Sequence, residues 1–467
     1  MRQPFARELN NLFERGRDRQ LRLAVTGLSR AGKTAFLTAL VHQLRHAGQD
    51  GGLDLLPAAR EGRLLGAQRI SQPDLGVPRF PFDQAMAALD ATPPRWPEPT
   101  RGISELRLSI RYRPARGGLL KRDAAHLTLD LVDYPGEWLL DLPLLDHDYT
   151  SWSEGQIARL SDARHQGRRA IFHDWLRAVE ALAPAAEADE AQLAAIAESY
   201  AAALRNAREA GFADLQPGRF LLPGDLEGAP VLQFFPLPGV NVAERKELEA
   251  LPKTSVYRTL ARRFTHYQQH IVKPFYQEHF RRFDRQIVLA DVLGALNAGA
   301  ERFEDLSRAL STLMQSFDYG KRGLVSRLFA PRIDRLAIAA TKADHVTPEQ
   351  HGHLVGLLEA LLADPLRELR FSGVPVRAFS LASIRATRSR AAEHKGKFSP
   401  VLAGTTLTGN ELLVFPGEVP PRLPDAAFWL RQGFHFHSFR PLPREGGVLP
   451  HIRVDAVLDW LIGDKLQ

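Results

Sequence analysis

Cysteine is absent from the 467 residues, which excludes disulfides and thiolate metal sites and gives no sign of an oxidising compartment. Apolar runs are short, and none approaches the roughly 18 residues that a membrane span requires. The N-terminal sequence MRQPFARELNNLFERGRDRQ is too polar for a secretory signal. The formal net charge is +7. This excess favours anionic partners such as nucleotides, nucleic acid or acidic membranes without choosing among them.

Apolar patterning predicts a doubly wound α/β sheet. Near-continuous apolar runs are typical of central parallel strands, whereas the strict alternation of ELRLSIRY predicts a half-exposed edge strand. Helical patterns follow two of the later strands, at 301–317 and 349–363. After 387 the chain is predicted to be irregular until a last helix at 452–466, which is expected to pack on the sheet. The predicted strands are 21–26, 105–112, 126–133, 285–293, 335–344 and 374–380.

Between about 140 and 284 this alternation stops. Amphipathic helical patterns occupy 168–183, 190–211 and 255–283, and the intervening 212–254 is rich in proline and glycine. The simplest interpretation is a mostly helical domain inserted between two strands of the sheet. We therefore expect one discontinuous domain at 1–140 plus 285–467 and an inserted domain at 141–284.

The sequence GLSRAGKT follows the first predicted strand and precedes a predicted helix, as a phosphate-binding P-loop should. Such a loop points successive backbone N–H groups into one concavity, and glycines let the phosphate oxygens approach. Lys33 is placed to reach the β- and γ-phosphates, and the Thr34 hydroxyl is placed to bind Mg²⁺. The residues expected around the nucleotide here are Gly27, Ser29, Arg30, Ala31, Gly32, Lys33, Thr34 and Ala35.

A second motif, Asp133-Tyr134-Pro135-Gly136, ends a predicted strand downstream of the loop. It matches the D-x-x-G pattern of GTPases, in which the aspartate holds a magnesium-bound water and the glycine amide contacts the γ-phosphate. A threonine between the P-loop and the strand at 105–112 should complete the magnesium shell. Thr100 is the better placed candidate, and Thr92 is its rival.

Base recognition is predicted at Thr341-Lys342-Ala343-Asp344, which follows an apolar strand and matches the [NT]-K-x-D motif of GTPases. A carboxylate accepts hydrogen bonds from guanine N1–H and the 2-amino group, whereas adenine offers neither donor. The Lys342 stem is expected to cover the base. A later turn, Ser380-Leu381-Ala382-Ser383, supplies Ala382 and Ser383 as candidates for a backbone contact to guanine O6.

Two further residues are candidates for catalysis. Guanylate-binding proteins resemble this sequence at Arg30, where an arginine can swing onto the phosphates and neutralise charge that develops during hydrolysis. A solvent-facing arginine salt-bridged on the loop is the alternative. Glu137 follows the D-x-x-G motif, where small GTPases place a water-orienting glutamine. A carboxylate there would lie close to anionic phosphates, so slow turnover is expected.

Five stretches together resemble the YcjX-like P-loop GTPases: GLSRAGKT, TRGISELRL, LVDYPGEWLLDLPLL, DRQIVLADVLGALNAG and AATKADH. The resemblance implies a slowly hydrolysing GTP-binding protein of the bacterial cytoplasm, associated with stress responses. Members are often encoded beside an integral membrane protein, so the resemblance also implies a membrane partner and a peripheral location at the inner membrane.

We therefore expect a Ras-like P-loop G domain with a large helical insertion, binding GTP or GDP and Mg²⁺ as a nucleotide-dependent switch. A homodimer is a candidate assembly, and no nucleic acid is expected. Two alternatives stay open: a non-catalytic nucleotide-stabilised adaptor for a membrane protein, and a P-loop ATPase in which TKAD is a surface turn.

Overall fold

The computed structural model describes residues 19–47, 52–100, 102–115, 124–162, 164–318, 333–394, 397–431, 437–444 and 447–467. The chain divides into two compact units. The first contains the described residues of Met1–Tyr134, Phe283–Leu293 and Arg332–Gln467, and the second contains those of Pro135–Arg282 and Gly294–Pro331. The domain limits expected from the sequence remain a prediction, and these units differ from them mainly at Gly294–Pro331.

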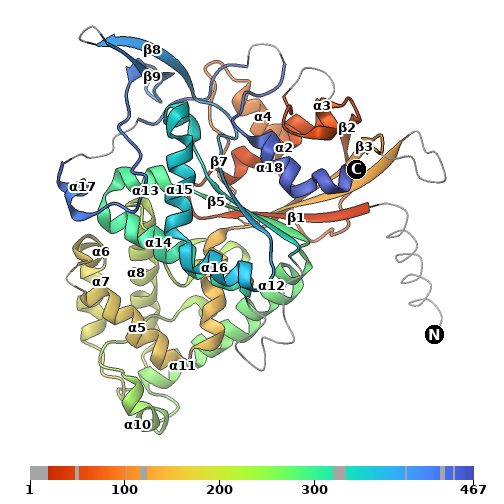
Figure 1. Cartoon of the computed structure of the whole chain (residues 1–467). Coiled ribbons are helices and arrows are strands. Elements are labelled where there is room, and N and C mark those ends of the chain that lie inside the picture. Colours follow the sequence, from red (N-terminus) through yellow and green to blue (C-terminus); the bar gives the residue numbers. More distant parts are fainter. Residues whose placement is uncertain are drawn as a thin grey trace, which may run out of the picture. The chain divides into compact units, whose positions relative to one another are not determined.

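The first unit is built on a seven-stranded sheet in the order β2-β3-β4-β1-β5-β6-β7 (Figure 1). The four contacts from β4 to β7 are parallel, and β2–β3 and β3–β4 are antiparallel. All the predicted strands are present. Their bounds are β1 Arg19–Gly27, β2 Leu64–Ile70, β3 Ser104–Tyr112, β4 Ala125–Asp133, β5 Arg285–Ala290, β6 Arg335–Ala340 and β7 Val376–Ser380.

Helices cover both faces of this sheet. One face packs on α2 and α18 in a continuous apolar core that includes Leu23, Leu129, Leu289 and Leu458. The predicted packing of the last helix on the sheet is thereby confirmed. On the other face α15 packs against β6 and β7. The helices assigned to this unit are α2 Lys33–Arg45, α3 Pro57–Arg60, α4 Phe82–Leu89, α15 His351–Leu361, α16 Ala363–Phe371, α17 Ala426–Arg431 and α18 Val454–Ile462.

Two predictions about this unit are wrong. The alternating strand β3 is not at the edge, because β2 pairs with it and is the outermost strand. The segment after 387 is not irregular: β8 Thr387–His394, β9 Lys397–Thr405 and β10 Glu411–Val414 form a three-stranded antiparallel sheet. Both misses involve strands in which most described side chains are polar or at least partly exposed, so an apolar pattern does not reveal them.

The second unit is mostly helical, as predicted. Its helices are α5 Tyr149–Ser161, α6 Gln166–Ile171, α7 His173–Glu180, α8 Glu190–Glu209, α9 Gly218–Leu221, α10 Arg245–Glu249, α11 Val256–Tyr267, α12 Lys273–Glu278 and α14 Ala300–Gln315, and α13 Val292–Ala298 enters it from the first unit. Aromatic rings fill its core, including Trp175 against Tyr200 at 4.8 Å and Trp152 against Phe264 at 5.1 Å between centroids. Among the described residues, no helix combines the length and apolarity that crossing a bilayer requires.

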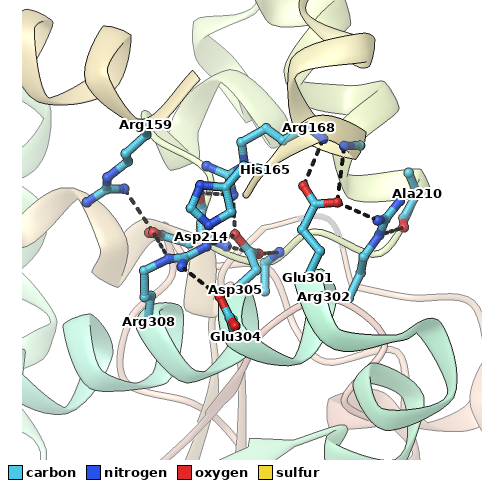
Figure 2. Close-up of polar contacts among 12 residues, drawn as sticks. Arg159, His165, Arg168, Ala210, Asp214, Glu301, Arg302, Glu304, Asp305 and Arg308 are labelled. Atoms are coloured by element: carbon cyan, nitrogen blue, oxygen red, sulfur yellow. Dashed lines mark hydrogen bonds and ion pairs between the residues drawn. The ribbon is translucent and has the colours of Figure 1, made fainter. Parts of the chain in front are cut away.

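A buried polar network ties α14 to the rest of the second unit (Figure 2). Asp305 on α14 pairs with Arg168 on α6, and its carboxylate also accepts the backbone N–H groups of Ala213 and Asp214. Asp214 in turn pairs with Arg159 on α5 at 2.8 Å. The Asp305 side chain is fully buried, and that of Arg168 is only 5% exposed. The charged Asp305 of α14 therefore lies in a polar part of this unit's interior.

A second buried carboxylate, Asp141, holds the 3₁₀ segment Gly136–Asp146 in this unit. Its oxygens accept the Gly218 amide at 2.7 Å and the Tyr267 hydroxyl at 2.6 Å. Burial raises the pKa of Asp141 to about 6, although these hydrogen bonds oppose the change. The segment that follows the D-x-x-G motif is therefore fixed to α9 and to the end of α11.

The raised pKa of Asp141 gives the second unit a pH-dependent stability. Because the folded pKa of about 6 exceeds the ordinary 3.8, proton binding favours the folded state, and this contribution is lost as pH rises through 6. Between pH 5 and pH 8 the wild type should lose about 1 kcal/mol of unfolding free energy that Asp141→Asn does not lose. Denaturant unfolding at both pH values measures the difference, with the exposed Asp174→Asn as control. Parallel pH profiles for wild type and Asp141→Asn would contradict this.

Candidate nucleotide-binding site

The P-loop connects β1 to α2, as predicted. A Cβ added to Gly27 would lie 2.5 Å from the carbonyl oxygen of Leu289, so this glycine is needed for the close approach of β5. Gly32 has φ +83°, a left-handed conformation that glycine adopts without strain. Lys33 then begins α2, and its ammonium donates to the Gly27 carbonyl across the mouth of the loop. The two glycines therefore serve different physical needs.

Arg30 is strained. Its φ is +63°, in a region that costs a residue with a side chain about 1–3 kcal/mol at functional sites. Its side chain and that of Ser29 are exposed, whereas Ala31 is buried and Ala35 half-buried. Arg30 forms no ion pair with any residue in the described part of the chain, so nothing in that part supports the salt-bridged alternative.

Two predicted magnesium ligands meet beside the loop. The hydroxyl oxygens of Thr34 and Thr100 are 3.2 Å apart. Mg²⁺ holds six ligands at about 2.0–2.1 Å in octahedral geometry, so neighbouring ligand atoms are about 3 Å apart. One ion could therefore bind both hydroxyls with little movement. This proximity favours Thr100 over Thr92.

Asp133 is the last residue of β4 and lies opposite Val25 of β1 in the parallel register. Because parallel strands end at the same edge, its carboxylate belongs to the edge from which the P-loop leaves. Asp133 is 1% exposed. The position fits a carboxylate that contacts magnesium through water.

The predicted base loop follows β6 at this edge. The Thr341 amide donates to Ala290 at the end of β5, and the Ala343 amide donates to Leu381 after β7. Lys342 has φ +60°, and its ammonium pairs with Asp291. The loop is therefore fixed on both sides, with the Lys342 stem held by an ion pair at its tip.

Asp344 is 4% exposed and has partners that sequence reasoning missed. Its Oδ2 accepts the Ala386 amide at 2.6 Å, its Oδ1 lies 3.2 Å from Nδ1 of His345, and its carbonyl accepts the Thr387 hydroxyl. Burial alone would raise the pKa of Asp344, but His345 and the Ala386 amide lower it below the usual value. The carboxylate is therefore ionised at neutral pH, as a guanine reader must be.

Of the two backbone amides predicted to contact guanine O6 in the Ser380–Ser383 turn, one already has a hydrogen-bond partner. The Ala382 amide donates to the Ile452 carbonyl at 3.1 Å, and Ile452 donates back to Ala382 at 2.8 Å. Next to it, Arg453 has φ +59° and donates to the Ser380 hydroxyl at 3.0 Å. The Ser383 amide has no hydrogen-bond partner among the described residues, which makes it the better candidate of the two.

The D-x-x-G motif crosses from the first compact unit to the second between Tyr134 and Pro135. Gly136 and Glu137 therefore stay predictions as parts of the site. Glu137 is 4% exposed, and its Oε2 has no hydrogen-bond partner in the described chain. A Cβ on Gly218 would lie 2.0 Å from the Glu137 carbonyl oxygen. Only a glycine at position 218 therefore allows the Glu137 backbone to pack this closely.

Comparison with known proteins supports these motifs. A sequence model of the YcjX-like family, DUF463, matches residues 21–466. The chain belongs to the YcjX-like family. This YcjX-like chain is 50% identical to the Ras-like GTPase YcjX of Escherichia coli (strain K12) over 464 residues, which cover 98% of this chain and 99% of that protein. It is 46% identical to the Ras-like GTPase YcjX of Shewanella oneidensis over 473 residues, covering 98% and 97%.

The family membership confirms the resemblance found in the sequence. It also fits the mostly parallel seven-stranded sheet with its P-loop after β1, so the YcjX-like chain contains a Ras-like P-loop G domain.

Proposed function

We propose that this protein binds GTP with Mg²⁺ and hydrolyses it slowly to GDP and phosphate, acting as a nucleotide-dependent switch. The observation that carries the proposal is the buried Asp344 carboxylate, which accepts the Ala386 amide in a loop at the same sheet edge as the P-loop. The names of the relatives, both Ras-like GTPases, support it.

Guanine specificity follows from the chemistry of the base loop. The Asp344 carboxylate has lone pairs beyond the one given to the Ala386 amide, because an ionised carboxylate offers about four acceptor positions. Guanine supplies two donors, N1–H and the 2-amino group, and adenine supplies none in that pattern. Thr341 and the Lys342 stem would flank the base, and the Ser383 amide, or Ala382 after release from Ile452, would meet O6.

Hydrolysis requires a bound metal, a polarised phosphate and an attacking water. Mg²⁺, when bound, neutralises charge on the β- and γ-phosphates. Thr34, Thr100 and Asp133 are the residues that would hold it. Lys33 and Arg30 would stabilise charge on the phosphates, the Gly136 amide would contact the γ-phosphate, and Glu137 would orient water.

The switch proposal is supported by the contacts of the segment after Gly136. Within the second unit, the carbonyls of Leu140 and Leu144 accept side-chain amides of Gln216 and Gln268. A rearrangement at Gly136 would therefore change the hydrogen bonds that this segment makes within the helical unit. We propose that this unit reports the nucleotide state to a partner, an integral membrane protein being the candidate, in a stress-related bacterial process. A nucleotide-stabilised adaptor without hydrolysis is the second candidate.

Calorimetric titration of GDP, GTP, ADP and ATP with Mg²⁺ tests base recognition by Asp344. Wild type should bind GDP at least tenfold more tightly than ADP. Asp344→Asn should bind GDP about 10- to 100-fold more weakly, because a charge-assisted hydrogen bond contributes about 1.5–3 kcal/mol.

Xanthosine diphosphate provides a gain-of-function control for the same variant. Xanthine has a carbonyl where guanine has the 2-amino group, so the introduced asparagine amide would donate to that carbonyl while its oxygen accepts N1–H. Asp344→Asn should therefore bind the xanthosine nucleotide more tightly than wild type does. Equal affinity of wild type for adenine and guanine nucleotides would remove the GTPase assignment and leave the ATPase alternative.

A further inference from the structure

A guanine base presents an acceptor, O6, beside the two donors that the Asp344 carboxylate would bind. This acceptor requires a donor from the protein. The Ala382 amide already donates to a main-chain carbonyl, and the Thr341 hydroxyl donates to another at 3.3 Å. Of the donors named for the base, the Ser383 amide is the one without a partner in the described chain. A carbonyl oxygen accepts two hydrogen bonds, so O6 has room for a second donor.

Arg453 lies at the edge of the sheet where the base is expected. Its Nη1 donates to the Ser380 hydroxyl at 3.0 Å. Ser380 ends β7 and stands opposite Ala340, the residue before the TKAD motif. The residue before Arg453, Ile452, exchanges two backbone hydrogen bonds with Ala382. The Arg453 guanidinium is therefore held where the base loop meets the turn that follows β7.

Arg453 and Asp344 both act on one buried side chain of α15, that of His351. Nε2 of His351 lies 2.9 Å from the Ala343 carbonyl oxygen in the base loop. Burial is the largest cause that lowers the pKa of His351, and the Ala343 contact opposes it; Arg453 also lowers this pKa, and Asp344 raises it. The guanidinium and the carboxylate therefore both lie near the base loop, as two groups that bind neighbouring atoms of one base should.

The backbone of Arg453 is strained. Its φ is +59°, in the left-handed region that glycine or asparagine adopts more easily. The other non-glycine residues with positive φ in the described chain are Arg30 of the P-loop and Lys342 of the base loop. Residues strained in this way cluster at functional sites, and these two belong to predicted nucleotide-binding motifs. The strain at Arg453 therefore points to a use for its side chain.

The Arg453 side chain has donors beyond the one given to Ser380. The residue is exposed, and a guanidinium carries five N–H donors in a fixed planar fork. No ion pair with a residue in the described ranges occupies them. One side of the fork can therefore stay on Ser380 while the other donates to a ligand.

We propose that Arg453 is a specificity-determining residue that donates a hydrogen bond to O6 of the bound guanine, while Asp344 accepts N1–H and the 2-amino group. Arginine on guanine O6 is the commonest specific contact between proteins and DNA bases. Adenine carries an amino donor in place of O6, and this donor would face the guanidinium without forming a hydrogen bond. Arg453 would therefore add to the discrimination against adenine. The inference rests on the proposed guanine site and assigns it a further residue.

Calorimetric titration of the full-length protein with two nucleotides tests this role. One is GDP, and the other is 2-aminopurine riboside diphosphate, which lacks O6 and keeps the 2-amino group and both phosphates. Arg453→Asn should bind GDP at least about tenfold more weakly than wild type, and the 2-aminopurine nucleotide within about threefold of wild type. Arg453→Gly, whose backbone adopts the same φ without strain, should show the same two results.

Arg377→Asn is the matched control, because it removes the same charge from an exposed residue of β7. It should bind both nucleotides as wild type does. Equal weakening of both nucleotides by Arg453→Asn would mean that Arg453 only supports the start of α18, and would overturn the inference. Unchanged GDP binding would overturn it too. In both cases a wild-type preference for GDP over ADP leaves the guanine proposal intact, whereas a wild type without that preference refutes the guanine proposal and this inference together.

Discussion

Replacement of Arg30 by alanine should slow GTP hydrolysis at least about a hundredfold while GTP affinity changes less than threefold. An arginine that neutralises charge on the transferred phosphoryl group is worth about 10³–10⁵ in rate when a partner supplies it, and a weaker effect is expected from one already in the loop. The side chain is exposed, forms no ion pair among the described residues, and extends from a backbone held at φ +63°. It is therefore available to move onto bound phosphates. Single-turnover hydrolysis with saturating Mg²⁺–GTP measures the effect.

Arg30→Gly separates the side chain from the backbone. Glycine adopts the left-handed conformation without strain, so this variant should be more stable than Arg30→Ala by about 1 kcal/mol. If the guanidinium acts in catalysis, both variants lose hydrolysis to the same extent despite their different stability. Hydrolysis at the parent rate in either variant would exclude an internal arginine finger.

Much of the first unit was predictable because its strands and loops follow strong local patterns. The runs that became β1, β5 and β6 are continuously apolar, since helices cover both faces of the sheet. The P-loop follows β1 and the TKAD motif follows β6. Because parallel strands end at the same edge of a sheet, the sequence predicted that both motifs lie at that edge. The Thr34–Thr100 contact was anticipated only as a preference between two threonines, and the observed 3.2 Å could not be calculated from spacing across 65 intervening residues.

The supports of Asp344 were not predictable in the same way. Ala386 and Thr387 hold its carboxylate and carbonyl, yet they stand at the start of β8, whose sequence TRSRAAEH has no apolar period. Hydrogen bonding and pairing with β9 form this strand, and neither leaves a hydrophobic signature.

The helix α14 shows a different limit. Its amphipathic pattern predicted a helix correctly, but a hydrophobic face does not say which core it joins. Contacts group α14 with the helical unit. The only hint in the sequence is Asp305, a charged residue between the apolar Phe303 and Leu306, and such a residue is equally compatible with a solvent-facing position.

The largest stability effect is expected from the network around Asp305. Arg168→Met should destabilise the second unit by up to about 3–5 kcal/mol, because the buried Asp305 carboxylate then keeps only Arg308, 3.4 Å away, as an ion-pair partner among the described residues. The Asp305 carboxylate is fully buried, and the Asp214 carboxylate is 1% exposed; Figure 2 shows the two side chains near each other. Burial already raises the pKa of Asp214. Loss of the Arg168 guanidinium would raise the pKa of Asp214 further, because Arg168 is one of the charges that oppose this effect of burial.

A second substitution should reverse most of this loss. In Arg168→Met/Asp305→Asn, the asparagine oxygen still accepts the Ala213 and Asp214 amides. Both charges of the Arg168–Asp305 ion pair are removed. A neutral, hydrogen-bonded replacement of a buried ion pair is often close to neutral in stability, so the double variant should unfold nearer to wild type than Arg168→Met does. Thermal unfolding should place Arg168→Met about 10 °C below wild type, with Arg164→Met, an exposed arginine on the same unit, as control. An unchanged midpoint for Arg168→Met, or a double variant less stable than the single one, would mean that the ion pair does not hold α14 in the helical unit.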